Sequence, residues 1–195
     1  MSLSPVAVRV AQPQDASDLI EVWTQPVEGE REPAVPELAA PPVSEASSAI
    51  ARIASDPEQM LLVAETEGRL VGAVHLRRGP ISPIKLTEAV HLSHLHVRAA
   101  SRRRGVATAL LSAATTWAEE KDSSHLIAMS PASSRDAHRF LARIGFGQVA
   151  VVRAAPVTAL RARFTAAAAG SRDTGRLIAK RRHLRRRSAQ GLAAR

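Results

Sequence analysis

Cysteine is absent from the 195-residue sequence, which excludes disulfide bonds, cysteine-based metal sites and a cysteine nucleophile. Long apolar runs are absent too, and none approaches the roughly 18 residues that a membrane-spanning helix needs. The first residues lack the basic and then apolar pattern of a secretory signal. The length is that of about one domain, large enough to bury a sizeable core. We therefore expect a single cytoplasmic domain without membrane contact.

Acidic residues are scarce in the C-terminal extension, residues 169–195. From Ser171 to Arg195 there are nine Lys and Arg residues against Asp173 alone, so this stretch carries +8 of the formal +9 charge. Aromatic residues are missing from its basic run, so stacking on nucleic-acid bases is not expected. Two interpretations stay open: a solvated extension, or an electrostatic contact with the phosphates of RNA or DNA. Residues 1–168 are expected to form the folded domain.

The most informative segment is Leu95–Ala107, where a strand-like alternation runs directly into the pattern Arg102-x-x-Gly105-x-Ala107. A helical pattern follows, and its apolar positions share one face: Ala107, Leu110, Leu111, Ala114, Trp117 and Ala118. The first N–H groups of a helix have no acceptor within it, and the helix dipole adds positive potential there. Gly105 and Ala107 leave room for a ligand close to the backbone, and Arg102–Arg104 add cationic donors. The segment therefore predicts a phosphate-binding turn.

This turn matches neither of two common phosphate motifs. A P-loop would end in Gly-Lys-Ser/Thr, and a dinucleotide-binding turn would carry three glycines. Taken alone, the turn also fits an ordinary helix N-terminus with solvated arginines, so both interpretations stay open at this point.

Two blocks of the sequence together resemble the GNAT superfamily of acyl-CoA-dependent N-acyltransferases. The family signature Arg/Gln-x-x-Gly-x-Gly/Ala comes shortly after a strand that ends in a β-branched residue; the residues that fit it are Val97, Arg102, Gly105 and Ala107. A second family block, Asn-x-x-Ala-x-x-Leu/Phe-Tyr-x-x-x-Gly-Phe, resembles Ser134–Phe146. Its matching residues are Ala137, Phe140, Gly145 and Phe146. Ser134 and Leu141 stand at its asparagine and tyrosine positions. The resemblance covers residues 6–153.

The resemblance implies an α/β fold, a single GNAT-like domain whose mixed, mostly antiparallel central sheet is flanked by helices and splays apart at the acyl-CoA site. It implies acetyl-CoA as co-substrate, with the pantetheine arm along the strand that ends at Val97 and the pyrophosphate at the amides of the turn. The implied CoA-binding residues are Leu95, His96, Val97, Arg102, Arg103, Arg104, Gly105, Val106, Ala107, Thr108, Ser134 and Phe140. The acidic, proline-rich stretch of residues 26–43 would lie where the family builds its acceptor pocket.

Three histidines lie on the strand expected at residues 89–97. Strand alternation gives it two faces, one with His91, Ser93, Leu95 and Val97 and the other with His94 and His96. His91 stands eleven residues before Arg102, where several GNAT members carry their base, so the resemblance makes His91 and Ser93 the catalytic candidates. A half-buried strand histidine with a structural role is the alternative. A metal site is not expected, because the faces separate the histidines and no acidic ligand accompanies them.

The remaining elements are predicted from periodicity and turn residues. Strands are expected at residues 6–10, 60–65, 70–76, 125–129 and 146–153, and helices at 13–23, 44–54 and around 160–164. The second and third of these strands should form a hairpin that turns at Glu67 and Gly68. Ser133 and Asp136 resemble a capping box that opens a further helix, which closes at Gly145. Five prolines and four glutamates make residues 26–43 an expected loop.

Tyrosine is absent from the whole sequence, which bears on the chemistry that the resemblance implies. In this family a tyrosine at the position of Leu141 commonly protonates the departing thiolate. With a pKa of roughly 8.5, a thiol is still a tolerable leaving group near neutral pH. We therefore predict an N-acetyltransferase that moves acetyl directly from acetyl-CoA to a primary amine of a small molecule or protein. A weakly catalytic or non-catalytic acyl-CoA-binding regulatory or interaction module is the alternative.

Two further expectations concern the protein as a whole. Arginine outnumbers lysine 24 to 3, a bias associated with GC-rich bacterial genomes, so we expect a bacterial protein. A monomer or a homodimer is expected.

Overall fold

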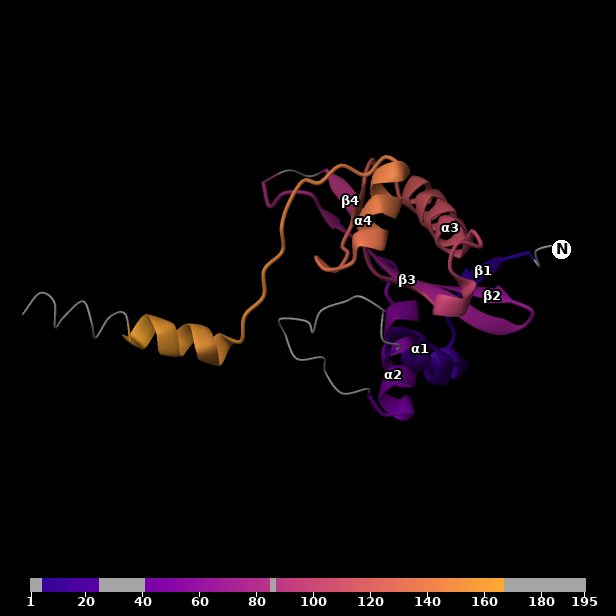
Figure 1. Cartoon of the computed structure of the whole chain (residues 1–195), viewed down its shortest axis with the longest axis horizontal. Coiled ribbons are helices and arrows are strands. Elements are labelled where there is room, and N and C mark those ends of the chain that lie inside the picture. Colours follow the sequence, from indigo (N-terminus) through magenta and orange to yellow (C-terminus); the bar gives the residue numbers. More distant parts are fainter. Residues whose placement is uncertain (1–4, 25–40, 85–86, 167–195) are drawn as a thin grey trace, which may run out of the picture. The chain divides into compact units, whose positions relative to one another are not determined.

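The computed structural model describes residues 5–24, 41–84 and 87–166 (Figure 1). The chain divides into two compact units, one of residues 1–32 and 37–149 and one of residues 33–36 and 150–195. The predicted loop lies mostly outside the described residues, and so does the basic extension. None of the helices within the described ranges is long and apolar enough to cross a membrane.

The first unit contains a five-stranded sheet and its flanking helices. In chain order its elements are β1 (Ala7–Val10), the short 3-10 helix η1 (Pro13–Asp15), α1 (Ala16–Thr24), α2 (Val43–Ala54), β2 (Gln59–Thr66), β3 (Arg69–Pro80), β4 (Glu88–Val97), the 3-10 helix η2 (Ala99–Ser101), α3 (Val106–Glu120), β5 (Leu126–Ala128) and α4 (Arg135–Arg143). The strands lie in the order β1-β2-β3-β4-β5, and each pair is antiparallel except β4 and β5. A parallel pair needs a crossover, and α3 provides it. The predicted mixed, mostly antiparallel sheet is confirmed.

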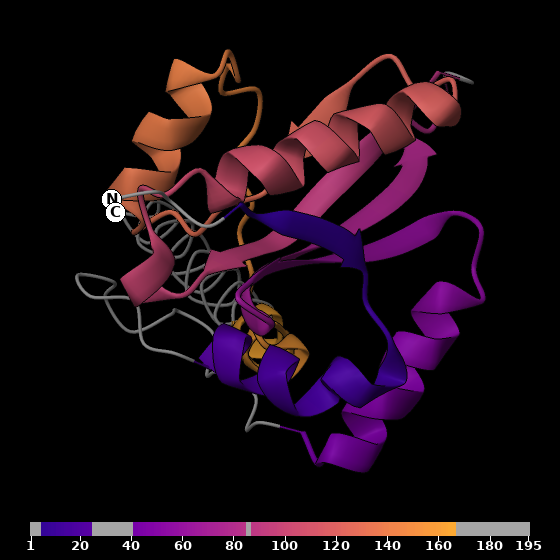
Figure 2. The same cartoon turned by 90° about the vertical axis from the view of Figure 1, so that its right-hand side faces the viewer.

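Helices cover both faces of this sheet (Figure 2). Helices α3 and α4 pack on one face, where Val74, Leu76, Val90 and Leu92 of the sheet meet Leu110 and Trp117 of α3 in one buried cluster. Helices α1 and α2 pack on the other face, where Leu61, Val63 and Ala73 meet Leu19 of α1 and Ile50 of α2. The helical face predicted after the turn is confirmed, with Val106 buried as well and Ala107 partly exposed.

Gly72 on β3 allows the first turn of α3 to approach the sheet closely. A Cβ atom at Gly72 would lie 2.9 Å from the carbonyl oxygen of His96 and 2.9 Å from Cγ1 of Val106. Any larger residue would push α3 away from β3 and β4. This contact therefore fixes the N-terminus of α3 beside the end of β4.

Local predictions hold in two of three places. The hairpin between β2 and β3 turns at Glu67 and Gly68, both in the left-handed backbone region, as predicted. Helix α4 closes at Gly145, with φ of +104°, but its N-cap is Ser134, whose hydroxyl accepts the N–H of Ala137 at 3.4 Å. The capping box predicted at Ser133 is thus wrong by one residue.

The strand predicted at residues 146–153 is wrong. These residues have no regular structure and pair with no strand in the described part of the chain. The valines that suggested a strand are largely exposed, at 87% for Val149, 64% for Val151 and 78% for Val152. Strand propensity reflects packing on a half-buried pleated surface, and these largely exposed valines do not have such a surface within the described residues.

The second unit contains one described helix, at residues 157–166. It includes Leu160 and Phe164, as the sequence predicted. The predicted domain boundary between residues 168 and 169 stays a prediction.

Candidate functional site

The turn before α3 presents a row of unpaired backbone N–H groups. Gly105 is the N-cap of α3 with φ of +82°, and Arg103 also has a left-handed φ of +60°. The first bond of the helix runs from the N–H of Ala109 to the carbonyl of Gly105 at 2.9 Å. Among the described residues, the N–H groups of Arg103–Thr108 donate to no backbone carbonyl. Alternating turn and left-handed conformations gather such N–H groups into a concave anion site, which the helix dipole strengthens.

The space in front of this turn is open and positively charged. A Cβ atom at Gly105 would meet no atom within 4 Å. Arg102, Arg103 and Arg104 are exposed, and none of them pairs with an acidic group in the described parts of the chain. Arg102 alone is tethered, since its Nε donates to the carbonyl of Val97 at 3.4 Å. These donors suit a pyrophosphate, and the predicted binding of one at this turn stays a prediction.

Strands β4 and β5 separate in front of the same turn. They pair only from Val90 to Leu92 of β4, and the last bond joins the N–H of Met129 to the carbonyl of Leu92 at 2.8 Å. The β4–β5 pairing therefore stops at Leu92, five residues before the end of β4 at Val97, and the predicted splay of the sheet is confirmed.

A β-bulge at His94 reverses the predicted faces of β4. His94 has a left-handed φ of +53°, and the pairing with β3 jumps from Ser93 opposite His75 to His96 opposite Ala73. Two residues of β3 thus span three residues of β4. Alternation fails across an inserted residue.

The corrected faces follow from the cross-strand partners, because opposed residues lie on one face. His91, Ser93 and His96 lie opposite Arg77, His75 and Ala73, on the face that α1 and α2 cover. Leu95 and Val97 pack with the cluster under α3. The prediction that grouped His91 and Ser93 with Leu95 and Val97 is therefore wrong, and so is the predicted separation of His96 from His91 and Ser93.

Side chains on the α1 and α2 face form one continuous hydrogen-bonded chain, here called the histidine chain. Its members, in order, are Asp56, Gln59, His75, Ser93 and His94. The bonds are 2.7 Å from Gln59 Nε2 to Asp56 Oδ2, 3.0 Å between Gln59 Oε1 and His75 Nε2, 3.3 Å between His75 Nδ1 and Ser93 Oγ, and 3.1 Å between Ser93 Oγ and His94 Nδ1. The chain thus leads from β2 across β3 to the bulge of β4.

His75 is the buried member of the histidine chain. Burial lowers the pKa of His75, and the positive potentials of His94 and Arg77 act in the same direction. His75 is therefore neutral at physiological pH. The sequence alone does not single out His75 as a site residue, because only the β3–β4 register reveals that a β3 residue faces Ser93.

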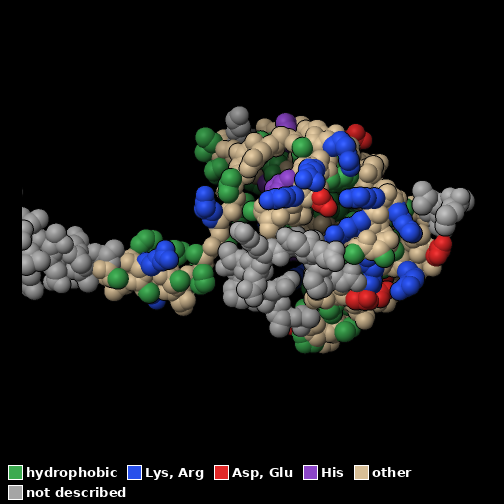
Figure 3. All heavy atoms as spheres, in the orientation of Figure 1, with side chains coloured by type: hydrophobic (Ala, Val, Ile, Leu, Met, Phe, Trp, Pro, Cys, Tyr) green, Lys and Arg blue, Asp and Glu red, His purple; other side chains and the backbone are tan. Residues whose placement is uncertain are grey.

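Trp23 of α1 holds the exposed end of the histidine chain. Its indole N–H donates to the carbonyl of His94 at 3.1 Å, and its ring meets the His94 ring edge-on with centroids 5.9 Å apart. Figure 3 shows histidine side chains in a hollow over β4, with Lys and Arg side chains beside it.

The remaining predicted site residues are placed as follows. His91 is half-buried, and its ring lies over Gly79. A Cβ atom added at Gly79 would be 3.8 Å from Cδ2 of His91. Among the described residues, no hydrogen bond orients that ring. Ser134 caps α4, and Phe140 packs against the core. Their predicted roles stay predictions.

Leu141 stands in the core with an exposed fraction of 8%, so that position supplies no hydroxyl. Within the described ranges, no group of three or more His, Asp or Glu side chains is arranged to hold a metal ion.

Comparison with known proteins gives one sequence match and many structural ones. A sequence model of the acetyltransferase (GNAT) family matches residues 21–146, well over half of the chain. Among curated proteins, none matches the sequence. The structural matches include a transcriptional regulator from Bacillus halodurans C-125, with 21% identity and a TM-score of 0.66, covering 78% of this chain and 99% of that one.

Two similar structures are named as N-acetyltransferases. The glucosamine-6-phosphate N-acetyltransferase from Arabidopsis thaliana has 13% identity and a TM-score of 0.64, with 78% of this chain and 99% of that chain covered. The aminoglycoside N-acetyltransferase AAC(6')-Iy in complex with CoA has 15% identity and a TM-score of 0.62, with 78% and 95% covered. At these identities the likeness shows a shared fold.

Proposed function

Since the chain belongs to the acetyltransferase (GNAT) family, we propose that it is an N-acetyltransferase that moves an acetyl group from acetyl-CoA to a primary amine. One observation carries the proposal: the turn at the start of α3 presents unpaired N–H groups shortly after β4, the strand whose pairing with β5 stops at Leu92. A ligand with a pyrophosphate at one end and a long, narrow arm suits both features. The acceptor is a small molecule or a protein.

Acetyl-CoA fits the residues of the turn before α3 together with the end of β4. The amides of Arg103–Thr108 and the guanidinium of Arg104 would hold the pyrophosphate. The β4 backbone from Leu95 to Val97, which lies past the last β4–β5 pair, would bond the pantetheine arm. Bound acetyl-CoA supplies an acyl group on a good leaving thiolate.

The α1 and α2 face of β4 supplies the proton chemistry. The acceptor nitrogen must lose a proton before its lone pair can bond the acetyl carbon. The carbon–sulfur bond then breaks, its electron pair leaves on sulfur, and the nitrogen gives up a second proton. The thiolate takes one proton and solvent receives the other. His91 is the base that the sequence predicted, and the histidine chain ends at a second histidine on β4, His94.

Gly105→Glu tests the binding site. A side chain with negative charge would stand where the pyrophosphate binds, so we expect CoA affinity to fall at least a hundredfold in isothermal titration. Gly105→Asn tolerates the left-handed backbone without added charge and should lose much less. Gly147→Glu adds the same side chain at an exposed glycine with open space and should bind as wild type does. A folded Gly105→Glu variant with unchanged CoA affinity would contradict the proposal.

Burial of Leu141 favours a second candidate, an acyl-CoA-binding module with little catalysis. A panel of amines with acetyl-CoA, followed by thiol release, separates the two. Binding without thiol release on any amine supports the module, and release with one amine supports the enzyme.

A further inference from the structure

The histidine chain has a fixed direction, and Asp56 sets it. A carboxylate only accepts hydrogen bonds, so Gln59 must present its NH₂ group to Asp56. The N–H of Glu58 also donates to Asp56, and these two bonds hold the pKa of Asp56 below its usual value. The amide oxygen of Gln59 then faces His75. Because that oxygen only accepts, His75 must carry its proton on Nε2.

The tautomer of His75 decides the next two bonds. Neutral His75 with a proton on Nε2 has a lone pair on Nδ1, so the hydroxyl of Ser93 donates to it. Ser93 Oγ, having donated its proton, accepts from Nδ1 of His94. His94 is thereby held as the tautomer with a proton on Nδ1. Its Nε2 carries a lone pair.

The bulge lies just past the last pair between β4 and β5. His94 follows Leu92 by two residues, and Leu92 makes the last bond between β4 and β5. His94 is exposed, and no described residue bonds its Nε2. Trp23 fixes both the carbonyl and the ring edge of His94. The imidazole is thus oriented by Ser93 and by the Trp23 ring, the backbone of His94 is held by the indole N–H, and Nε2 is open.

We propose that His94 is the general base of the reaction, with Ser93 and His75 as positioning residues that fix its tautomer. This inference rests on the proposed acetyl transfer. The N–H bond of the acceptor ammonium breaks, nitrogen keeps the electron pair, and the proton bonds to His94 Nε2. The resulting imidazolium still donates from Nδ1 to Ser93. No proton moves along the chain, whose work is orientation.

His91 lacks these features. Its ring is half-buried opposite Arg77, and within the described chain no hydrogen bond selects its tautomer. It also lies where β4 and β5 are still paired, opposite Ile127. His91→Asn and His94→Asn therefore discriminate between the two candidate bases, since both remove an imidazole from the same strand.

Nitrogen NMR of the histidine rings in the free protein tests the tautomers without any turnover. Above neutral pH, we expect His94 to be protonated on Nδ1 and His75 on Nε2; the signals are assigned by loss in His94→Asn and His75→Gln. Ser93→Ala removes the acceptor of the His94 proton, and His94 should then shift toward the Nε2 tautomer. Ser93→Thr keeps a hydroxyl and should keep the wild-type pattern. A wild-type His94 protonated on Nε2 overturns the proposal.

Kinetics test the catalytic role. Asparagine tolerates the left-handed backbone of residue 94, so His94→Asn should fold. We expect its kcat to fall about a hundredfold with CoA affinity unchanged, and to fall much further than the kcat of His91→Asn. Ser93→Ala should lower kcat and Ser93→Thr should restore it.

The outcomes of these experiments distinguish the role of His94 from the acetyl transfer itself. A His91→Asn variant that loses more activity than His94→Asn overturns the role of His94 and leaves the acetyltransferase standing. A wild-type protein that binds CoA and acetylates no amine overturns the proposed function together with the base. Loss in His94→Asn alone, with the expected NMR tautomers, supports both.

Discussion

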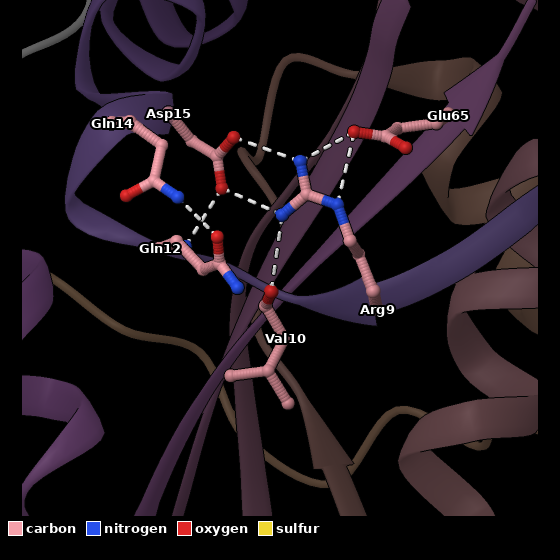
Figure 4. Close-up of polar contacts among 6 residues, drawn as sticks. All are labelled: Arg9, Val10, Gln12, Gln14, Asp15 and Glu65. Atoms are coloured by element: carbon pink, nitrogen blue, oxygen red, sulfur yellow. Dashed lines mark hydrogen bonds and ion pairs between the residues drawn. The ribbon is translucent and has the colours of Figure 1, made fainter. Parts of the chain in front are cut away.

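Two polar networks cross the sheet, and they are built on opposite principles. The first, here called the arginine cluster, consists of Arg9 on β1, Asp15 on η1 and Glu65 on β2 (Figure 4). Arg9 makes two bonds to Asp15, at 2.7 and 2.8 Å, and its Nε donates to Glu65 at 3.0 Å. The second is the histidine chain, in which only Asp56 is charged. The cluster pairs every charge, whereas the chain ends at an open histidine nitrogen.

The difference separates stability from chemistry. In the arginine cluster each group satisfies another, and Asp15 also accepts the N–H of Gln12 at 2.7 Å. All three guanidinium nitrogens of Arg9 donate within this cluster, so the cluster ties the N-terminal strand to the sheet. In the histidine chain the donor of each hydrogen bond fixes the donor of the next one. The last atom, Nε2 of His94, keeps a lone pair that can still accept a proton. Breaking the first should therefore cost stability, and breaking the second should cost activity.

The largest stability effect is expected from Asp15→Asn. Asp15 is 8% exposed, and the change removes its charge from two bonds with Arg9, which is half-exposed and screened by water. We expect a loss of about 2 kcal/mol in the free energy of unfolding, measured by urea denaturation. Asp122→Asn changes the same group type at an exposed, left-handed residue that makes no ion pair within the described chain, and it should be near neutral. Equal stability of both variants would show that the cluster is dispensable.

At acidic pH, Asp15 should lose its contribution to the free energy of unfolding. The Arg9 guanidinium, by hydrogen bonding, holds the pKa of Asp15 below its usual value, against the opposing effect of burial. A carboxyl with a depressed folded pKa stabilises the fold fully above its unfolded pKa of about 3.9 and loses this effect as the pH falls through the folded value. The difference between wild type and Asp15→Asn should therefore be constant above about pH 5 and shrink below about pH 4. A difference that grows on acidification would reverse the assigned sign.

The sequence predicts one side of the candidate site far better than the other. The turn before α3 is local: Gly105, the small Ala107 and the arginines act through backbone that is contiguous in the chain. Its N–H groups therefore lie as the pattern indicates. The sheet order is also accessible, because hairpins join neighbouring strands.

The face of β4 on which its histidines lie depends on His94, and a histidine in the sequence does not indicate a left-handed backbone. A left-handed φ at a glycine can be anticipated, but His94 adopts it only because the two strands must remain paired on both sides of the bulge. One inserted residue reverses the faces of all that follow. Likewise, the local sequence does not indicate that residues 146–153 pair with no strand in the described chain. Long-range strand pairing decides both the bulge at His94 and the structure of residues 146–153.

Glu65→Gln should cost less than Asp15→Asn. Glu65 is partly exposed, and a glutamine oxygen still accepts from Arg9, which keeps Asp15 as its charged partner. We expect a loss of about 0.5 kcal/mol by the same denaturation measurement. A loss as large as that of Asp15→Asn would mean that the guanidinium needs both charges.

The smallest stability effect is expected from His94→Asn, the change with the largest expected effect on turnover. Asparagine accepts the left-handed backbone that strains most residues, which offsets the loss of the edge contact with Trp23, worth about 0.5 kcal/mol. The free energy of unfolding should therefore stay within about 0.5 kcal/mol of wild type. His94→Val is the contrast, because a β-branched residue at φ of +53° should cost about 1–2 kcal/mol. If His94→Asn destabilises the protein as much as Asp15→Asn, the histidine chain stabilises the fold as the arginine cluster does, and the contrast between the networks fails.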